Sequence, residues 1–273
     1  MVEIQNIWRT VFGSLGAAAI VLALAALTAF AAKSEDLISG IGLTHLTVYD
    51  QRPAPDGEQS GSPHVHAVTD EGYYCMSGTG RVELHDLKNG FRSVELTPGR
   101  YLQFPPGTLH RLVNTGGLTI LVVMGNAGLA ERGDARIYFG KKVDGDPAEY
   151  ARLAGLPQSK GLEGALDRRD AAIRAYMNLI ELWEKDKKAY FADLGRFLNV
   201  HNQAMAKKKD GLQEAVEAGP LAWAGIAAGR LESLPKGEKD PVSLLFKPGD
   251  EIALGMCGIL RPIDKLEAVG ARR

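Results

Sequence analysis

Between residues 43 and 140, short apolar runs alternate with turn-forming residues, and this pattern constrains the fold of the chain more than any other feature. The runs are rich in Val, Leu, Thr and aromatic residues, which favour β-strands, and Gly, Pro, Asn or Asp stand between them. The runs are Leu43–Tyr49, Tyr73–Met76, Gly80–Leu84, Ser93–Leu96, Tyr101–Phe104 and Leu118–Met124. Strands at such close spacing predict a mainly β fold, either a sandwich or a barrel.

The hydrophobic period changes after a stretch of Gly, Pro and charged residues at 133–157. From there on, apolar residues recur every three or four positions, which is the spacing of one face of a helix. The first of them are Ile173, Met177, Ile180 and Trp183. We therefore expect an amphipathic helical region over residues 160–218.

Large aromatic residues continue this apolar face at Trp183, Tyr190 and Phe197. We expect them to form a seam by which the helices pack on the β domain or on one another, and a lid is the alternative. Residues 219–273 hold one strand-like segment among Gly and Pro residues, which predicts a short mixed tail.

The N-terminal region carries an uncharged apolar run from Val11 to Ala32, preceded by Arg9 and followed directly by Lys33. The small residues at 29 and 31 fit a signal-peptide cleavage site, whereas the length of the run suffices to span a bilayer as a helix. Two interpretations stay open: residues 1–32 are a cleaved signal peptide, or a membrane anchor retained through residues 11–32. Both predict an exported protein, periplasmic or extracellular.

Charge and cysteine content exclude several classes of protein. A formal net charge of −1 and a pI near 6.6 give no field that would gather nucleic acid, so we expect no nucleic-acid partner. Cys75 and Cys257 are too few for a disulfide scaffold and form no CxxC pair. Export would permit a bridge between them, but we expect free, buried thiols.

The stretch Ser62–Glu71, SPHVHAVTDE, places two histidines one residue apart ahead of a carboxylate. On a strand, residues two apart point to one side, so His64 and His66 should project together. Ala67–Asp70 is short enough to turn the chain, which lets Glu71 begin the next strand beside them. Imidazole nitrogens and a carboxylate oxygen bind divalent first-row metals at about 2.0–2.2 Å. A polar surface loop is the alternative, because an H-x-H pair alone is a weak signal.

A second stretch, Gly99–Asn114, reads as strand, Pro-Pro-Gly turn and strand, with His110 opening the second strand. Taken together, the two stretches resemble the paired motifs of the cupin superfamily. The matching residues are His64-x-His66, four residues, Glu71, six residues and Gly78, then Gly99, five residues, Pro105-x-Gly107, two residues, His110, three residues and Asn114. The sequence departs from the first motif at its leading glycine, which is displaced to Gly57 or Gly61. This departure concerns the entry loop and not the ligands.

The resemblance covers roughly residues 43–130 and implies a small antiparallel jelly-roll β-barrel over residues 43–140, followed by the helical region and the tail. It also implies that one divalent transition metal ion, Fe, Mn, Cu, Ni or Zn, is held by His64, His66, Glu71 and His110. A hydrogen-bonded polar cluster without metal is the alternative.

Residues around these ligands have simpler expected roles. Tyr73, Cys75, Tyr101 and Gln103 alternate on their strands and could line the site, although core packing is the simpler expectation for each. Arg111 should face away from His110. The remaining histidines lack partners at ligand spacing, and His201 is expected on a helix surface; they are His45, His85 and His201.

The cupin resemblance does not select a reaction, because the fold hosts many chemistries. Our leading expectation is an exported mononuclear-metal oxidoreductase, dioxygenase-like, acting on a small organic molecule, with Glu71 as ligand and catalytic base. A redox-neutral metal-dependent lyase or isomerase is the first alternative. A non-catalytic binding or sensory module for a small ligand is the second. Association as a homodimer stays open.

Overall fold

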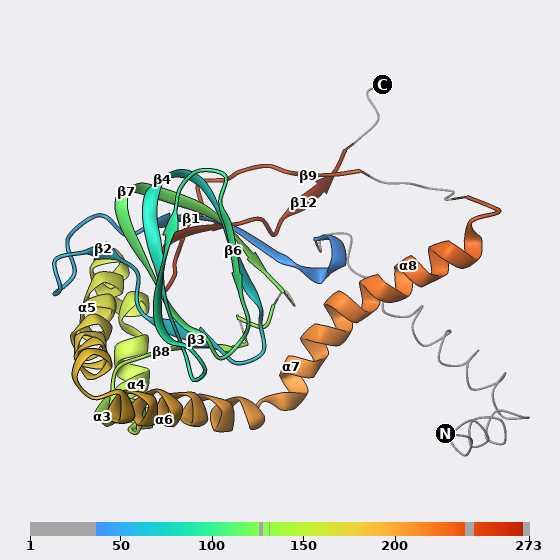
Figure 1. Ribbon diagram of the computed structural model, residues 1–273. Helices are drawn as coiled ribbons and strands as arrows, with labels where there is room; N and C mark the ends of the chain where they lie inside the picture. The colour runs from blue at the N-terminus through green and yellow to red at the C-terminus, as the bar shows by residue number, and fades with distance from the viewer. Residues whose placement is uncertain (1–36, 126–127, 131, 238–242, 270–273) are drawn as a thin grey trace, which may run out of the picture.

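The computed structural model describes residues 37–125, 128–130, 132–237 and 243–269 (Figure 1). The apolar run at 11–32, and with it both interpretations of the N-terminal region, lies outside the described residues. Within the described ranges, no helix combines the length and the apolarity that crossing a bilayer requires.

The order of elements along the chain follows the predicted change from strands to helices and back. The strands are β1 (Gly42–Val48), β2 (Gln59–Ser60), β3 (His64–His66), β4 (Glu71–Asp86), β5 (Gly90–Leu96), β6 (Tyr101–Phe104), β7 (Leu109–Met124), β8 (Ala135–Ile137), β9 (Leu244–Phe246), β10 (Ala253–Leu254), β11 (Gly258–Pro262) and β12 (Leu266–Ala268). The helical elements are η1 (Ile38–Gly40), α3 (Lys141–Asp144), α4 (Pro147–Ala154), α5 (Leu156–Lys185), α6 (Lys187–Ala206), α7 (Lys209–Val216), η2 (Glu217–Leu221) and α8 (Ala222–Ser233).

Among the described residues, ten strands join in one antiparallel sheet, and the long strands β4 and β7 pair along most of their length to form its spine. The predicted runs at 73–76 and 80–84 are one continuous strand, because a bulge between them lets β4 bend without ending. Gly78 is required there: its φ is 74°, and a Cβ would lie 2.2 Å from the carbonyl oxygen of Gly117. A mainly antiparallel β fold followed by helices is thus confirmed, and closure into a jelly-roll barrel stays a prediction.

The C-terminal segment returns to this sheet. Strand β11 pairs with β1 on the side away from β7, and β10 pairs with β11 (Figure 1). Just before β11, the carbonyl of Met256 accepts a hydrogen bond from the Ser62 amide at 2.8 Å. Part of the predicted mixed tail therefore lies against the stretch that carries His64.

Helices α5 and α6 pack on the β domain through a mixed aromatic and aliphatic seam. Val65 on β3 and Leu109 on β7 contact it from the sheet. Tyr190 and Phe197 are fully buried in it, and Trp183 packs against its edge, as the helical spacing predicts. Burial of such large side chains stabilises the docking of the helices by roughly 1.5–3 kcal/mol each.

The prediction that His201 lies on a helix surface is wrong. Its side chain is 1% exposed, and its Nε2 lies 2.6 Å from the carbonyl oxygen of Asp134. The reason is periodicity: His201 follows Phe197 by four residues on the buried face of α6, and Met205 follows His201 by four.

His85 is also buried and joins the sheet to the helices. Its Nδ1 lies 2.9 Å from the hydroxyl of Tyr190 on α6, and its Nε2 lies 2.6 Å from the hydroxyl of Tyr176 on α5. Burial lowers the pKa of His85 to about 3, and burial lowers the pKa of His201 to about 4. Both imidazoles are therefore neutral in the folded protein at neutral pH.

These two histidines predict a loss of stability in acid. The unfolded chain takes up their protons near pH 6.5, whereas the folded chain resists protonation down to about pH 4 for His201 and about pH 3 for His85. The free energy of unfolding of the metal-free protein should therefore fall as the pH drops below about 6.5, by up to about 1.4 kcal/mol per pH unit for each histidine. The measurement is denaturant unfolding in chelator across this range. His85→Gln should have a shallower slope than the parent, and equal slopes would contradict the assignment.

Candidate metal centre

Strand β3 carries two histidines toward the interior of the sheet and one valine away from it. His64 and His66 are 4% and 5% exposed, whereas Val65 packs into the helix seam on the opposite side. In the pairing of β3 with β7, His64 lies directly across from His110. Period-two alternation and this register bring three imidazoles together, as the sequence predicts.

Glu71 joins them because the chain reverses between β3 and β4. The backbone amides of Ala67, Val68 and Thr69 all donate hydrogen bonds to the carboxylate of Asp134 at 2.9–3.2 Å. This carboxylate holds the turn, and Glu71 then opens β4 between Phe104 on β6 and Met124 on β7. All four predicted ligands therefore meet, and we call them the ligand cluster: His64, His66, Glu71 and His110.

The potential ligand atoms of the cluster lie close enough together to surround one ion. One nitrogen or oxygen atom from each residue lies within 4.8 Å of every other. His110 Nε2 is 3.1 Å from His64 Nε2 and 3.0 Å from Glu71 Oε2. His66 Nε2 is 3.4 Å from the same carboxylate oxygen. All four side chains are buried, so water does not screen these contacts.

Each of the three imidazoles is held through its other ring nitrogen. His64 Nδ1 lies 3.0 Å from the Ser62 carbonyl oxygen, and His110 Nδ1 lies 3.0 Å from the Thr108 carbonyl oxygen. His66 Nδ1 lies 3.2 Å from Asp134 Oδ2. A carbonyl or an ionised carboxylate only accepts, so every Nδ1 carries the proton and donates it. A ring that is neutral in this tautomer therefore directs its Nε2 lone pair toward the other members of the ligand cluster.

This arrangement fits a cation. Two neutral imidazoles of this tautomer bring the lone pairs of His64 Nε2 and His110 Nε2 to within 3.1 Å of each other, which is unfavourable unless a positive charge lies between them. Glu71 Oε2 is buried and has no hydrogen-bond partner. Three imidazole nitrogens and a carboxylate oxygen form a donor set for a divalent transition metal.

The protonation states agree with such a site. Burial and then the neighbouring imidazole of His110 lower the pKa of His64 well below its usual value. Burial by itself would raise the pKa of Glu71, but the imidazoles, that of His110 first, outweigh burial and lower it to about 2. At neutral pH the site thus offers a neutral imidazole at His64 and an ionised carboxylate.

Asp134 is a residue of the candidate site that the sequence analysis missed. It is 0% exposed, and although burial opposes ionisation, hydrogen bonds from His66 and Thr69 lower its pKa to about 2. Its only sequence signal is a lone Asp in the Gly-rich stretch before β8. The pairing of β3 with β8 brings it to His66 from 68 residues away.

Cys257 is the second residue near the site that the motifs do not contain. The tail places its Sγ 3.7 Å from His64 Nε2 and 4.0 Å from the Tyr73 hydroxyl. Burial, and then Cys257 and Glu71, raise the pKa of Tyr73 well above its usual value, and burial raises the pKa of Cys257. Both cysteines are free and buried, as expected.

The other residues considered around the site occupy four kinds of position. Tyr73 borders the ligand cluster, and Cys75 packs in the core. Tyr101 and Gln103 are exposed, so the expectation of core packing is wrong for both, because their side of β6 faces solvent. Arg111 points away from His110, as expected, and pairs with Asp56 at 2.7 Å and Glu83 at 3.3 Å.

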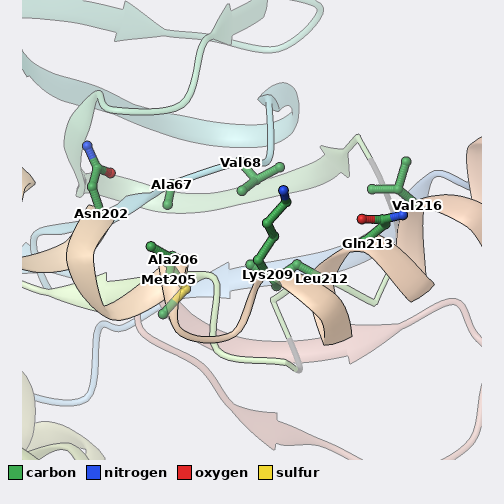
Figure 2. Close-up of a pocket in the computed structure, with 9 residues that line it drawn as sticks. All are labelled: Ala67, Val68, Asn202, Met205, Ala206, Lys209, Leu212, Gln213 and Val216. Atoms are coloured by element: carbon green, nitrogen blue, oxygen red, sulfur yellow. The ribbon is translucent and has the colours of Figure 1, made fainter.

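A pocket of about 360 Å³ lies beside the turn that follows His66 (Figure 2). Ala67 and Val68 line it from this turn, and residues of α6 and α7 line it from the other side. Its lining is mostly apolar, with the polar residues Asn202, Lys209 and Gln213 and no member of the ligand cluster. The pocket is therefore separate from the site.

Comparison with known proteins identifies one domain. Residues 54–124 match the family model described as the cupin domain. The sugar 3,4-ketoisomerase QdtA from Thermoanaerobacterium thermosaccharolyticum is 14% identical with a TM-score of 0.28, over 34% of this chain and 64% of that chain. A cupin protein from Bacteroides fragilis is 19% identical with a TM-score of 0.25, over 33% of this chain and 68% of that chain.

A third similar structure is WlaRA, a TDP-fucose-3,4-ketoisomerase from Campylobacter jejuni, which is 12% identical with a TM-score of 0.25, over 29% of this chain and 57% of that chain. This chain thus covers less than two thirds of the length of both ketoisomerases. No curated protein matches the chain.

Replacing one histidine of the ligand cluster should weaken metal binding, whereas replacing a histidine outside the cluster should not. His66→Ala removes one nitrogen donor, and we expect the affinity for Zn²⁺ to fall by at least about tenfold. The control is His45→Ala, since His45 is a partly buried histidine of β1 outside the ligand cluster. Competition titration with a chromogenic chelator measures both. Unchanged affinity in His66→Ala would refute the ligand assignment.

Asp134→Asn tests the support of His66 separately. The substitution can keep Oδ1, which accepts from Ala67 and Val68, but it replaces Oδ2 by an amide nitrogen that cannot accept from the His66 ring or from the Thr69 amide. We expect Zn²⁺ affinity to fall by about ten- to a hundredfold because the ring loses its orientation. Far-UV circular dichroism checks that the fold is retained. A folded variant with the parent's affinity would contradict this role.

Proposed function

Because residues 54–124 place this chain in the cupin superfamily, we propose that it is a mononuclear metalloenzyme that acts on a small organic molecule bearing oxygen atoms. The observation that carries the proposal is the convergence of the Nε2 atoms, with every Nδ1 already bonded to an acceptor of the protein. A purely structural polar cluster would instead provide a strong donor for each lone pair, whereas the thiol of Cys257, whose Sγ lies 3.7 Å from His64 Nε2, is a weak donor.

A divalent ion bound by the ligand cluster would supply a Lewis acid with one or two positions open to substrate and, in the case of iron or copper, a redox centre. The residues of the chain supply the rest. Glu71 is ionised and can act as ligand and as base. Tyr73 and Cys257 stay protonated beside it, because burial raises the pKa of both.

Two reaction classes follow from this site. The leading one is a dioxygenase-like oxidation, supported by a donor set of nitrogen and oxygen atoms that suits redox-active iron, manganese or copper. The second is a redox-neutral lyase or isomerase reaction. It is supported by the ionised Glu71 lying near two protonated groups, since a base and an acid on one substrate are what proton transfer requires.

We propose further that the protein is exported and held at a membrane by residues 11–32, because this run is uncharged and long enough to span a bilayer. Of the two interpretations of the N-terminal region, we propose the retained anchor. N-terminal sequencing of the protein from the membrane fraction separates retention from cleavage: a chain that begins before residue 11 supports the anchor, and one that begins near residue 32 refutes it.

Metal analysis combined with turnover tests the enzymatic proposal. Protein purified without added metal should contain about one divalent transition ion per chain, and His110→Ala should contain far less because it removes a ligand. A screen of small acids, phenols and sugars then follows oxygen uptake and product formation. Iron or copper with oxygen uptake supports the oxidative class. Turnover without oxygen uptake supports the redox-neutral class. Metal-loaded protein without turnover on any compound would leave a binding module and contradict the enzyme proposal.

A further inference from the structure

Helix α8 extends away from the β domain and has an apolar face that no described part of the chain covers (Figure 1). Its apolar residues stand three or four positions apart, so they share one side of the helix and its flanks. The exposed ones are Ala224, Ala227, Ala228 and Leu231 on α8, together with Leu221 at the end of η2 and Leu234 directly after α8, whereas Ala222 is buried and Trp223 and Ile226 are half-buried. We call the exposed set the α8 stripe.

The exposure of the α8 stripe is unusual for large aliphatic side chains. Leu221 is 52% exposed, Leu231 is 67% exposed and Leu234 is 70% exposed. Arg230 and Glu232 flank the stripe on its two sides, and Ser233 lies on the opposite side of the helix. An exposed apolar surface of this kind marks a site of contact with a membrane or with another protein.

The start of the described chain is attached to the base of this helix. The turn η1 contacts both η2 and α8. The contact is backbone against backbone, because a Cβ on Gly40 would lie 2.5 Å from the Pro220 nitrogen, and Gly40 has a φ of 63°. Ile38, in the same turn, is 69% exposed and adds to the apolar surface.

This attachment limits the distance between the apolar run and α8. Only residues 33–36 separate Ala32 from Leu37, so five peptide steps join the end of the run to η1. Fully extended, they span at most roughly 18 Å. If residues 11–32 cross a bilayer, its polar headgroup region therefore lies within roughly 18 Å of η1, which contacts the base of α8.

We propose that α8 is a membrane-surface helix, with the α8 stripe inserted at the boundary between lipid headgroups and acyl chains. This inference rests on the proposed membrane anchor at residues 11–32 and is independent of the metal chemistry. Burying three leucines in lipid removes apolar surface from water, which stabilises the contact. The anchor already holds the chain at the membrane, so it raises the effective concentration of the lipid surface near the α8 stripe. The consequence is a second attachment that sets the orientation of the β domain relative to the membrane.

The test places an environment-sensitive fluorophore on each side of α8 in the full chain. Leu231→Cys puts the label on the α8 stripe, and Ser233→Cys, also exposed, puts it on the opposite side as a matched control. The native thiols of Cys75 and Cys257 are buried, so labelling selects the introduced one. Each labelled chain is reconstituted in vesicles of phosphatidylethanolamine and phosphatidylglycerol, with and without brominated acyl chains.

We expect the label at 231 to shift its emission to shorter wavelength on reconstitution and to lose intensity with brominated lipid, while the label at 233 changes little. Equal responses at the two positions would overturn the proposal. So would a label at 231 that is already shielded without lipid, which would mean that a second copy or residues 11–32 cover the stripe. A chain that floats with vesicles but keeps the label at 231 in water would retain the anchor and refute the α8 contact.

Discussion

Three imidazole rings, each held through Nδ1 by an acceptor of the protein, determine the direction of three Nε2 lone pairs, and the candidate site depends on this constraint. Two of the acceptors are carbonyls located two residues before the histidine that they hold, at Ser62 and Thr108. Because both carbonyls lie just before a strand, the backbone at the start of β3 and β7 sets the tautomer. The 3.1 Å approach of His64 Nε2 to His110 Nε2 then favours a cation over any neutral occupant.

The fold supplies this geometry from widely separated parts of the chain. Strand β7 places His110 across from His64, and β8 brings Asp134 to the side of His66. The segment before β11 closes the site with Cys257, although it lies far outside the cupin match. Behind β3, Val65 packs into the seam with α5 and α6, so displacement of the helices would also disturb the ligands. The helices and the tail are therefore structural parts of the site.

The sequence predicted what depends on local rules. Alternation along β3 and the short turn after it were enough to bring the ligand cluster together. Asp134 and the position of Cys257 could not be predicted, because they depend on the pairing of β3 with β8 and of β1 with β11, which no local period encodes. The surface position predicted for His201 is wrong because His201 shares the buried side of α6 with Phe197 and Met205.

The central claim is that the Nδ1 atoms of the ligand histidines carry the protons and leave Nε2 for one metal ion. Long-range ¹⁵N–¹H correlation spectra of the imidazoles, recorded before and after addition of Zn²⁺, measure this directly. We expect Nδ1–H tautomers at His64, His66 and His110 in the metal-free protein, and a shift of all three Nε2 resonances on saturation at one ion per chain. Protons on Nε2 at these positions, or Nε2 resonances that do not shift when Zn²⁺ is added, would contradict the proposed metal coordination through Nε2.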